Sequence, residues 1–239
     1  MEISSADIEI KLVKDGKLLE KAQELRMKIF FKAQGRDQDK FDPYCMHVVA
    51  LDKKTGKVIG NYRLLLGADA QRGEGFYAET KFDISNIKKN CQGQLLEMGR
   101  ACVDEDYRKL RIVPLMWRAI NAFIKDNDVS YILGSSSVYD PTPQMISMFQ
   151  RLFKEKYYSQ PELRVYPREA RQYPYDDNPG QDIDQNQIIQ LLPALMQSYL
   201  KMGAVVCGEP VKEPVFNTAV FFMLLKTKYM NSFYKNRFL

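Results

Sequence analysis

The segment Leu95-Leu96-Glu97-Met98-Gly99-Arg100-Ala101-Cys102-Val103 places two charged side chains inside an apolar run with the character of a strand. Burying either Glu97 or Arg100 costs free energy unless the charge is paired or used in a site. The segment therefore predicts a strand that carries either a functional site or a structural ion pair.

The surrounding sequence predicts a strand, a helix and a second strand. After the strand at 94–103, apolar residues from Val113 to Ile124 recur at helical spacing, with Pro114 in the first turn. The run at 129–138 is the next strand. A strand, crossover helix and strand in one sheet form a parallel pair with a right-handed connection.

The N-terminal part adds a strand, a helix and a hairpin. Residues 8–13 alternate as in a strand, and 17–32 have helical spacing of apolar residues. The runs at 46–52 and 58–65 are joined by a tight loop containing Gly56, which predicts a β-hairpin.

The C-terminal part predicts two helices and the closing strands. A helix is expected at 141–157 and another at 191–202, ended by Gly203, with strands at 204–207 and 215–226. The Pro-, Tyr- and Asp-rich stretch at about 159–185 is expected to be an irregular insertion. We predict one domain over 1–239, of the α/β class, with a mixed, mostly antiparallel sheet flanked by helices.

Composition excludes several classes of protein. The 239 residues are 45% apolar, which is enough to fill a hydrophobic core. The mild net charge of +5 suits an acidic protein partner or an anionic membrane surface but decides between neither, and we expect no nucleic-acid partner. Four cysteines without a CxxC pair and a single histidine leave no ligand set for zinc, so we expect no metal and reduced thiols. The N-terminus has no leader pattern, and the longest apolar run, 219–225, is far shorter than the roughly 20 residues of a membrane span. We expect a cytoplasmic protein and leave a peripheral membrane contact open.

The order of these motifs resembles the GNAT superfamily, and within it the amino-acid N-acyltransferases of the ornithine-lipid, or hemolysin-like, type, together with the related acyl-homoserine-lactone synthases. The resemblance covers most of the chain. It rests on Arg26 and Phe30, 39–42 with Cys45 and His47, 60–65, 75–77, 96–103 with Tyr107 and Arg108, 115–117, 192–195, Tyr199 and Leu200, and Gly203 and Ala204.

The resemblance implies a GNAT fold with a splayed parallel strand pair. It also implies transfer of a fatty acyl group, which includes 3-hydroxy acyl groups, from acyl carrier protein to the α-amine of an amino acid such as ornithine or glycine. The donor would be carried on the phosphopantetheine of the carrier protein, with no tightly bound cofactor. Two alternatives stay open: a lactone synthase-like enzyme, and a GNAT-fold module without catalysis that acts in interactions or on membranes.

The expected catalytic residues are Glu97, Arg100 and Arg63. An amine attacks a thioester only when neutral, so the reaction needs a carboxylate base, for which Glu97 is the candidate. By resemblance to the lactone synthases, the two arginines would lie near the acceptor and the carbonyl. The alternative is that Glu97 and Arg100 are structural ions. Because residues three apart in a strand face opposite sides, the two can share a site only if Gly99 permits a bulge or bend.

The start of the helix at 113–124 is the expected donor-binding region. Acetyl-CoA-dependent relatives carry two small residues in the loop that holds the diphosphate, whereas 108–113 reads Arg-Lys-Leu-Arg-Ile-Val. The basic residues instead suit a single phosphate and an acidic carrier protein. The expected donor-binding set is Val103, Arg108, Lys109, Arg111 and Arg118. A solvated, charged helix start is the alternative for each basic residue.

The remaining candidates concern the substrates. By resemblance, the expected substrate-binding set is Arg26, Phe30, Asp39, Asp42, His47 and Ser136. Exposed turn acids are the alternative for Asp39 and Asp42, a hydrogen-bonded core histidine for His47, and plain core for Phe30. Ser136 belongs to the strand expected to splay around the pantetheine arm.

Overall fold

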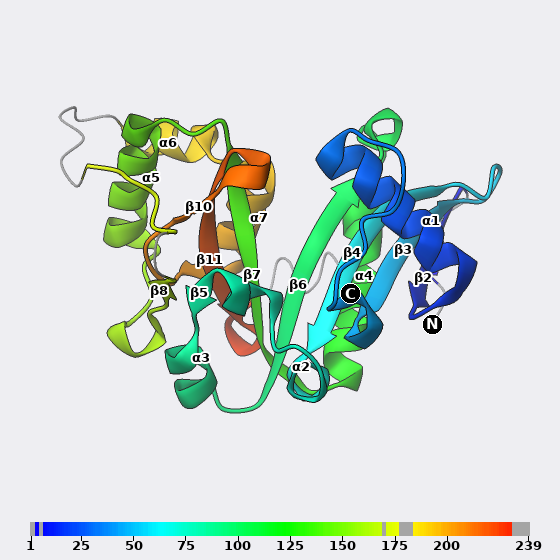
Figure 1. Ribbon diagram of the computed structural model, residues 1–239, viewed down its shortest axis with the longest axis horizontal. Coiled ribbons are helices and arrows are strands. Elements are labelled where there is room, and N and C mark those ends of the chain that lie inside the picture. The colour runs from blue at the N-terminus through cyan, green and yellow to red at the C-terminus, as the bar shows by residue number, and fades with distance from the viewer. Residues whose placement is uncertain (1–2, 5–6, 169–170, 177–183, 231–239) are drawn as a thin grey trace. The chain divides into compact units, whose positions relative to one another are not determined.

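The computed structural model describes residues 3–4, 7–168, 171–176 and 184–230 (Figure 1). The described chain packs into two compact units. The first contains the residues up to Phe76 together with Gln94–Val129, and the second contains Tyr77–Gly93 and the described residues from Ser130 onward.

The first unit is built on an antiparallel sheet. Its strands are hydrogen-bonded in the order β1, β2, β3, β4, β6. Their bounds are β1 Ile3–Ser4, β2 Ile8–Val13, β3 Met46–Asp52, β4 Val58–Leu66 and β6 Gln94–Val103. The predicted hairpin is confirmed as β3 and β4, and Gly56 in its turn has φ +65°, a conformation that glycine adopts without strain.

Helices cover both faces of this sheet. The main ones are α1 (Gly16–Arg26), which continues as a π-helical turn at Met27–Phe31, and α4 (Ile112–Asp126). Tyr62 points toward α4, where its aromatic ring packs edge-on against Trp117, with 6.5 Å between the ring centroids. Because side chains alternate along a strand, its neighbours Asn61 and Arg63 point to the α1 side. Shorter elements of this unit are the 3-10 turns Asp42–Tyr44 and Glu105–Tyr107 and the helix α2 (Gly67–Arg72).

A β-bulge interrupts the pairing of β4 with β6. Asn61 opposes Cys102 and Arg63 opposes Gly99, so two residues, Arg100 and Ala101, stand opposite Tyr62 alone. The predicted bulge is therefore confirmed, but its predicted position at Gly99 is wrong. Arg100 takes the left-handed backbone conformation, with φ +50°, whereas φ of Gly99 is not in that region.

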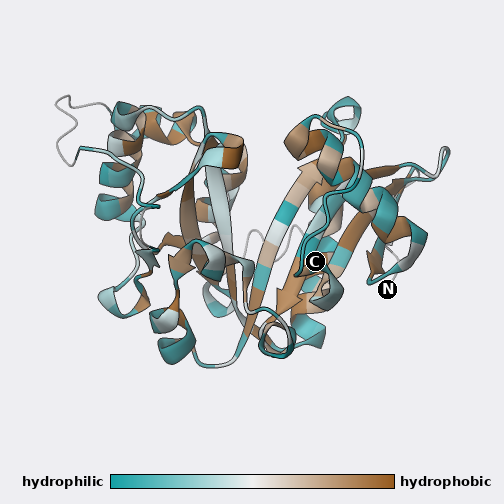
Figure 2. Cartoon of the chain, viewed as in Figure 1, coloured by the Kyte–Doolittle hydropathy of each residue, from teal (hydrophilic) through white to brown (hydrophobic). Residues whose placement is uncertain are grey.

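The second unit contains the other strands and helices. The strand β11 is almost wholly buried and apolar (Figure 2), and it pairs antiparallel with β7, β9 and β10. The strands are β5 Phe82–Asp83, β7 Val129–Tyr139, β8 Tyr166–Pro167, β9 Val205–Val206, β10 Val211–Glu213 and β11 Thr218–Lys226. The helices are α3 Ser85–Asn90, α5 Pro143–Lys156, α6 Gln185–Leu191 and α7 Ala194–Met202, with 3-10 turns at Tyr77–Thr80, Pro161–Leu163, Pro214–Phe216 and Thr227–Tyr229.

Two predictions about the C-terminal part need correction. The helix expected at 191–202 begins only at Ala194, because Leu192 is extended and Pro193 stands as the N-cap of α7. The separate helix α6 at Gln185–Leu191 was not predicted. The strand expected at 215–226 begins only at Thr218, since Pro214 opens a 3-10 turn. Within the predicted insertion at 159–185, residues 169–170 and 177–183 lie outside the described residues.

The mainly antiparallel sheet with flanking helices confirms the predicted α/β fold class. Among the helices that the structure describes, none combines the length and the apolar character needed to cross a lipid bilayer.

Candidate active site

Three arginines and three aspartates alternate in a closed ring of hydrogen-bonded ion pairs on the α1 side of the sheet. Each arginine bonds two of the aspartates and each aspartate bonds two of the arginines, at nitrogen–oxygen distances from 2.6 to 3.0 Å. In order around this Arg–Asp ring, the residues are Arg26, Asp42, Arg63, Asp39, Arg100 and Asp37.

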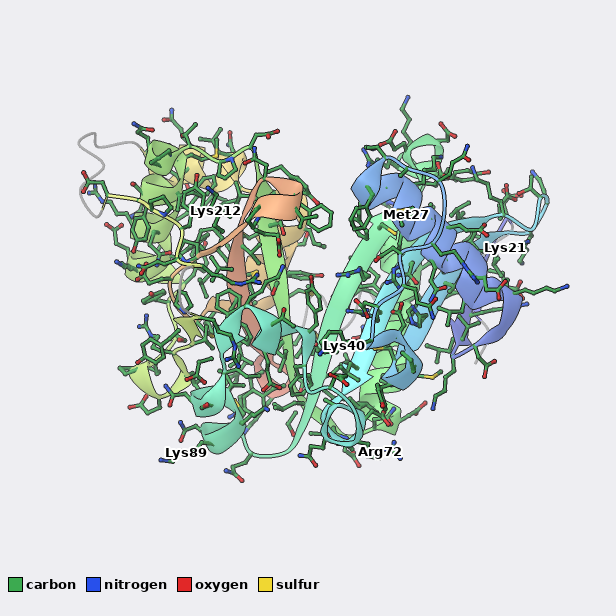
Figure 3. All side chains as sticks on the ribbon, viewed as in Figure 1. Lys21, Met27, Lys40, Arg72, Lys89 and Lys212 are labelled. Carbon is green, nitrogen blue, oxygen red and sulfur yellow. The ribbon has the colours of Figure 1, made fainter. Side chains whose placement is uncertain are left out.

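The aspartates of the ring come from one short segment, and the arginines from three separate elements. Met27 and Lys40, labelled in Figure 3, lie at the end of α1 and in the loop that follows it. The loop is held by its own backbone, because Asp37 N donates to Gln23 O at 3.1 Å and Asp39 N donates to the Asp42 side chain at 3.2 Å. These bonds aim three carboxylates at arginines supplied by α1, β4 and β6.

The charges of the ring are buried, so each one needs a partner of opposite charge. Arg26 has no exposed surface and Asp42 is 2% exposed. Burial by itself opposes ionisation of Asp42, but hydrogen bonds and charge interactions with Arg26 and Arg63 outweigh it and lower the pKa of Asp42 to about 2. Burial by itself lowers the pKa of Arg63, but its interactions with Asp39 and Asp42 outweigh burial and raise it. Asp42 and Arg63 are therefore held in their charged forms.

Glu97 lies on the same face of the sheet as this ring. It opposes Leu65 in the ladder, two residues from the pair Arg63 and Gly99, so its side chain points to the side of Arg63. Glu97 is 6% exposed, and its charge acts on Cys45, whose pKa is raised to about 12, chiefly by burial. The bulge turns Arg100 to this face as well, where its guanidinium reaches Asp37 and Asp39.

His47 is a core residue next to Arg63 and Asp42 of the Arg–Asp ring. It is fully buried, opposes Arg63 in the ladder, and places Nε2 3.8 Å from Asp42 Oδ1. Burial lowers the pKa of His47 to about 4, so its imidazole is neutral at pH 7. Nδ1 lies 3.4 Å from Asn61 Oδ1.

The other predicted substrate residues occupy different surroundings. Asp42 is buried, so it is not an exposed turn acid, and the side chain of Asp39 is 20% exposed. Phe30 is half-buried and packs against the core cluster that includes Leu25. Ser136 is a buried residue of β7 in the second unit, opposite Phe221, and its role toward the donor stays a prediction.

The expected donor-binding residues surround the start of α4. Arg108, Lys109, Arg111 and Arg118 are all exposed, and Val103, the last residue of β6, is half-buried. The buried carboxylate of Asp104 accepts from Lys57 Nζ at 2.9 Å and Lys28 Nζ at 3.2 Å. Two more lysines thus lie beside this region, and no local pattern in the sequence predicts them.

The sequence analysis missed Asp37 and Asn61. Asp37 stands two residues before Asp39, and this acidic spacing was the signal that could have included it. Asn61 lies in the 60–65 segment that carries the family resemblance, but no local pattern distinguishes it from its neighbours as a site residue. Within the described ranges, no group of three His, Cys, Asp or Glu side chains is arranged to hold a metal ion.

Comparison with known proteins finds similar sequences and similar folds. A model of the acetyltransferase (GNAT) domain matches residues 22–118, a span that contains the whole Arg–Asp ring and Glu97. The L-ornithine N(alpha)-acyltransferase of Brucella abortus (strain 2308) is 26% identical over 244 residues, which cover 95% of this chain and 87% of that protein. The chain is therefore similar to L-ornithine N(alpha)-acyltransferases, and part of it matches the GNAT domain.

Further comparisons agree with this similarity. The L-ornithine N(alpha)-acyltransferase of Rhizobium meliloti (strain 1021) is 26% identical over 248 residues, covering 97% of this chain and 84% of that protein. An N-acyl amino acid synthase from uncultured soil microbes shares the fold, with a TM-score of 0.54 at 9% identity, over 92% of this chain and 91% of that one. The predicted family resemblance is confirmed, and these relationships support an N-acyltransferase enzyme.

Proposed function

We propose that this protein transfers a fatty acyl group, including 3-hydroxy acyl groups, from acyl carrier protein to the α-amine of an amino acid, giving a lyso-aminolipid. The observation that carries the proposal is the buried Glu97 on the face of the Arg–Asp ring, in a chain similar over almost its whole length to L-ornithine acyltransferases. A module without catalysis has no need for a buried carboxylate beside this ring.

The proposed chemistry gives each charged group a task. Glu97 accepts a proton from the acceptor ammonium, directly or through water, and frees the nitrogen lone pair. The amine attacks the thioester carbonyl carbon, the C–S bond breaks, and the thiol of the pantetheine leaves with a proton. Arg63 and Arg100 orient the acceptor carboxylate or the reacting carbonyl, a task that suits a planar guanidinium already held in place.

The charge of the site favours a cationic acceptor. The three arginines and three aspartates of the ring cancel, and His47 is neutral at pH 7. An ionised Glu97 then leaves the group with one formal negative charge. In a poorly solvated site, an amino acid with a second ammonium group balances this charge, whereas glycine does not. We therefore propose ornithine, the acceptor named for the curated relatives, ahead of glycine.

The loop before α4 supports a carrier-protein donor over acetyl-CoA. Several amides of this loop already donate to carbonyls within it: Leu110 N to Tyr107 O at 3.0 Å and Ile112 N to Leu110 O at 2.8 Å. These amides are not free to cradle a diphosphate. The exposed basic residues around it fit the phosphate of a phosphopantetheine and the acidic surface of its carrier.

The proposal is tested with the purified protein and defined substrates. Acyl carrier protein loaded with a 3-hydroxy fatty acid, the matching acyl-CoA and acetyl-CoA are each incubated with ornithine, lysine, glycine or S-adenosylmethionine, and products are identified by mass spectrometry. We expect N-acyl ornithine from the loaded carrier protein. Acetylated products alone, or no product from any pair, would contradict the proposal, and a lactone from S-adenosylmethionine would favour the synthase-like alternative.

A further inference from the structure

The β6 bulge requires a residue that holds it. Arg100 has φ +50°, and a residue with a Cβ in the left-handed region carries a conformational cost that the surroundings must offset. The bulge also interrupts the regular ladder between β4 and β6 at Tyr62. The position of Arg100 therefore depends on contacts outside the ladder.

One such contact holds the main chain of Arg100. Asn61 Nδ2 donates to the carbonyl oxygen of Arg100 at 3.0 Å. Asn61 has no exposed surface and belongs to β4, next to the point where the register shifts. Because the amide is buried, loss of this bond would leave a polar group without compensation from water.

A second contact fixes which way the Asn61 amide points. Asn61 Oδ1 only accepts hydrogen bonds, and it faces His47 Nδ1 at 3.4 Å. A neutral imidazole carries one N–H, so the contact with Oδ1 assigns that proton to Nδ1. With Oδ1 turned to His47, the amide nitrogen of Asn61 must turn toward Arg100.

The side chain of Arg100 is held separately. Its Nε lies 2.9 Å from Asp37 Oδ2, and its Nη2 lies 3.0 Å from Asp39 Oδ2. Arg100 is thus held at its backbone from β4 and at its guanidinium from the loop after α1. If the backbone anchor fails, the chain can relax out of the left-handed conformation and draw the guanidinium away from these acids.

We propose that Asn61 is a positioning residue, oriented by His47, that fixes the Arg100 bulge and thereby the guanidinium of Arg100 in the site. The inference rests on the proposed function for the task of Arg100. Neither Asn61 nor His47 is required to touch a substrate.

The first test uses Asn61→Asp, which keeps the acceptor toward His47 and replaces the donor with an oxygen that repels the Arg100 carbonyl. The matched control is Asn86→Asp, because Asn86 Nδ2 also donates to a main-chain carbonyl, that of Arg164, at 3.0 Å. We expect Asn61→Asp to lower kcat about 10- to 100-fold and Asn86→Asp to change it less than about twofold.

A double-mutant cycle separates positioning from general destabilisation. In an Arg100→Lys background, Asn61→Asp should lower kcat by less than a further factor of about two, because its effect passes through Arg100. If the fold-losses in kcat of the two single variants multiply in the double variant, the proposal is overturned.

A readout without activity separates this inference from the proposed function. Hydrogen exchange of arginine Nε–H groups is followed by NMR, with the Arg100 signal assigned by its loss in Arg100→Lys. In Asn61→Asp we expect exchange at Arg100 to quicken at least about tenfold, while exchange at Arg26, whose Nε also bonds Asp37, stays within about twofold. Unchanged exchange at Arg100 would overturn the proposal even in an active enzyme. An inactive wild-type protein would instead count against the proposed function alone.

A second variant covers the case in which Asn61→Asp does not fold. His47→Leu removes the group that orients the amide, and His47→Asn restores a donor near the position of Nδ1. We expect faster exchange at Arg100 in the first and recovery toward wild type in the second; equal exchange in both would contradict the role given to His47.

Discussion

Arg26 and Asp42 form a two-point ion pair out of contact with solvent, with Nη1 2.9 Å from Oδ1 and Nη2 3.2 Å from Oδ2. The side chain of Arg26 is 0% exposed and that of Asp42 is 2% exposed. A buried pair of this kind gives little net stability over apolar residues, but removal of one partner leaves the other charge without compensation.

Asp42→Asn should therefore destabilise the protein strongly. We expect a loss of about 3–5 kcal/mol in the free energy of unfolding, measured by urea denaturation at pH 7. Glu74→Gln is the matched control, since it breaks an exposed ion pair with Lys40 and should cost about 1 kcal/mol or less. A similar small cost for both variants would mean that the ring does not stabilise the first unit.

The stability of the protein should fall with pH in two steps. The pKa of His47 is about 4 in the folded protein and 6.5 ordinarily, so its contribution is present above pH 6.5 and lost as pH falls toward 4. Asp42 has a folded pKa of about 2 against 3.8, so its contribution is lost only between pH 3.8 and 2.

Each full step is worth on the order of 2–3 kcal/mol, and urea denaturation at pH 7, 5, 4 and 2 follows the His47 step above pH 4 and the Asp42 step below it. His47→Gln should abolish the step between pH 7 and 5 and keep the lower one. A wild-type stability that is flat from pH 7 to 5 would show that His47 is not held neutral by burial.

Gly99→Ala should be close to neutral. A Cβ built at Gly99 meets nothing within 4 Å, and its φ is outside the left-handed region. We expect a change within about 1 kcal/mol of either sign in a thermal unfolding experiment. Gly93→Ala is the contrasting variant, because φ is +104° there and a Cβ would come within 2.8 Å of the Ser130 Cβ, so it should destabilise clearly. A large loss of stability in Gly99→Ala would mean that the bend of β6 depends on glycine at position 99.

Charge reversal at the start of α4 should weaken use of the donor. The double variant Arg108→Glu and Arg111→Glu should raise the KM for acyl carrier protein about tenfold or more and leave the KM for the amino acid unchanged. Lys21→Glu, which reverses an exposed charge on α1 (Figure 3), is the control. Equal KM values for acyl carrier protein in the wild type, the double variant and Lys21→Glu would contradict a docking role for these arginines.

Sequence patterns predicted the elements of the fold well, because they depend on local periodicity. The alternation in β2 and the glycine turn between β3 and β4 are local signals, and both elements appear with the expected bounds. The start of α7 after Pro193 was also visible in the sequence, since proline is tolerated only near the beginning of a helix, but the prediction placed the helix start at Leu191.

The site could be predicted only in part, because it depends on contacts distant in sequence. Glu97 and Arg100 are conspicuous as charges in an apolar strand, and Asp39 and Asp42 follow from the family resemblance. Asp37 became a member of the ring only through the path of the loop, and Asn61 only through the register shift of β4 against β6. The left-handed backbone of Arg100 contradicts the local preference for glycine at a bulge, so tertiary contacts must impose it.

The central claim is that Glu97 is the base of an acyl transfer from carrier protein to an amino acid. The most direct measurement is the steady-state rate of N-acyl ornithine formation by wild-type protein and by Glu97→Gln, with folding of both checked by thermal unfolding. We predict that kcat/KM falls about 10²- to 10⁴-fold in the folded variant. Full activity of folded Glu97→Gln would contradict the claim.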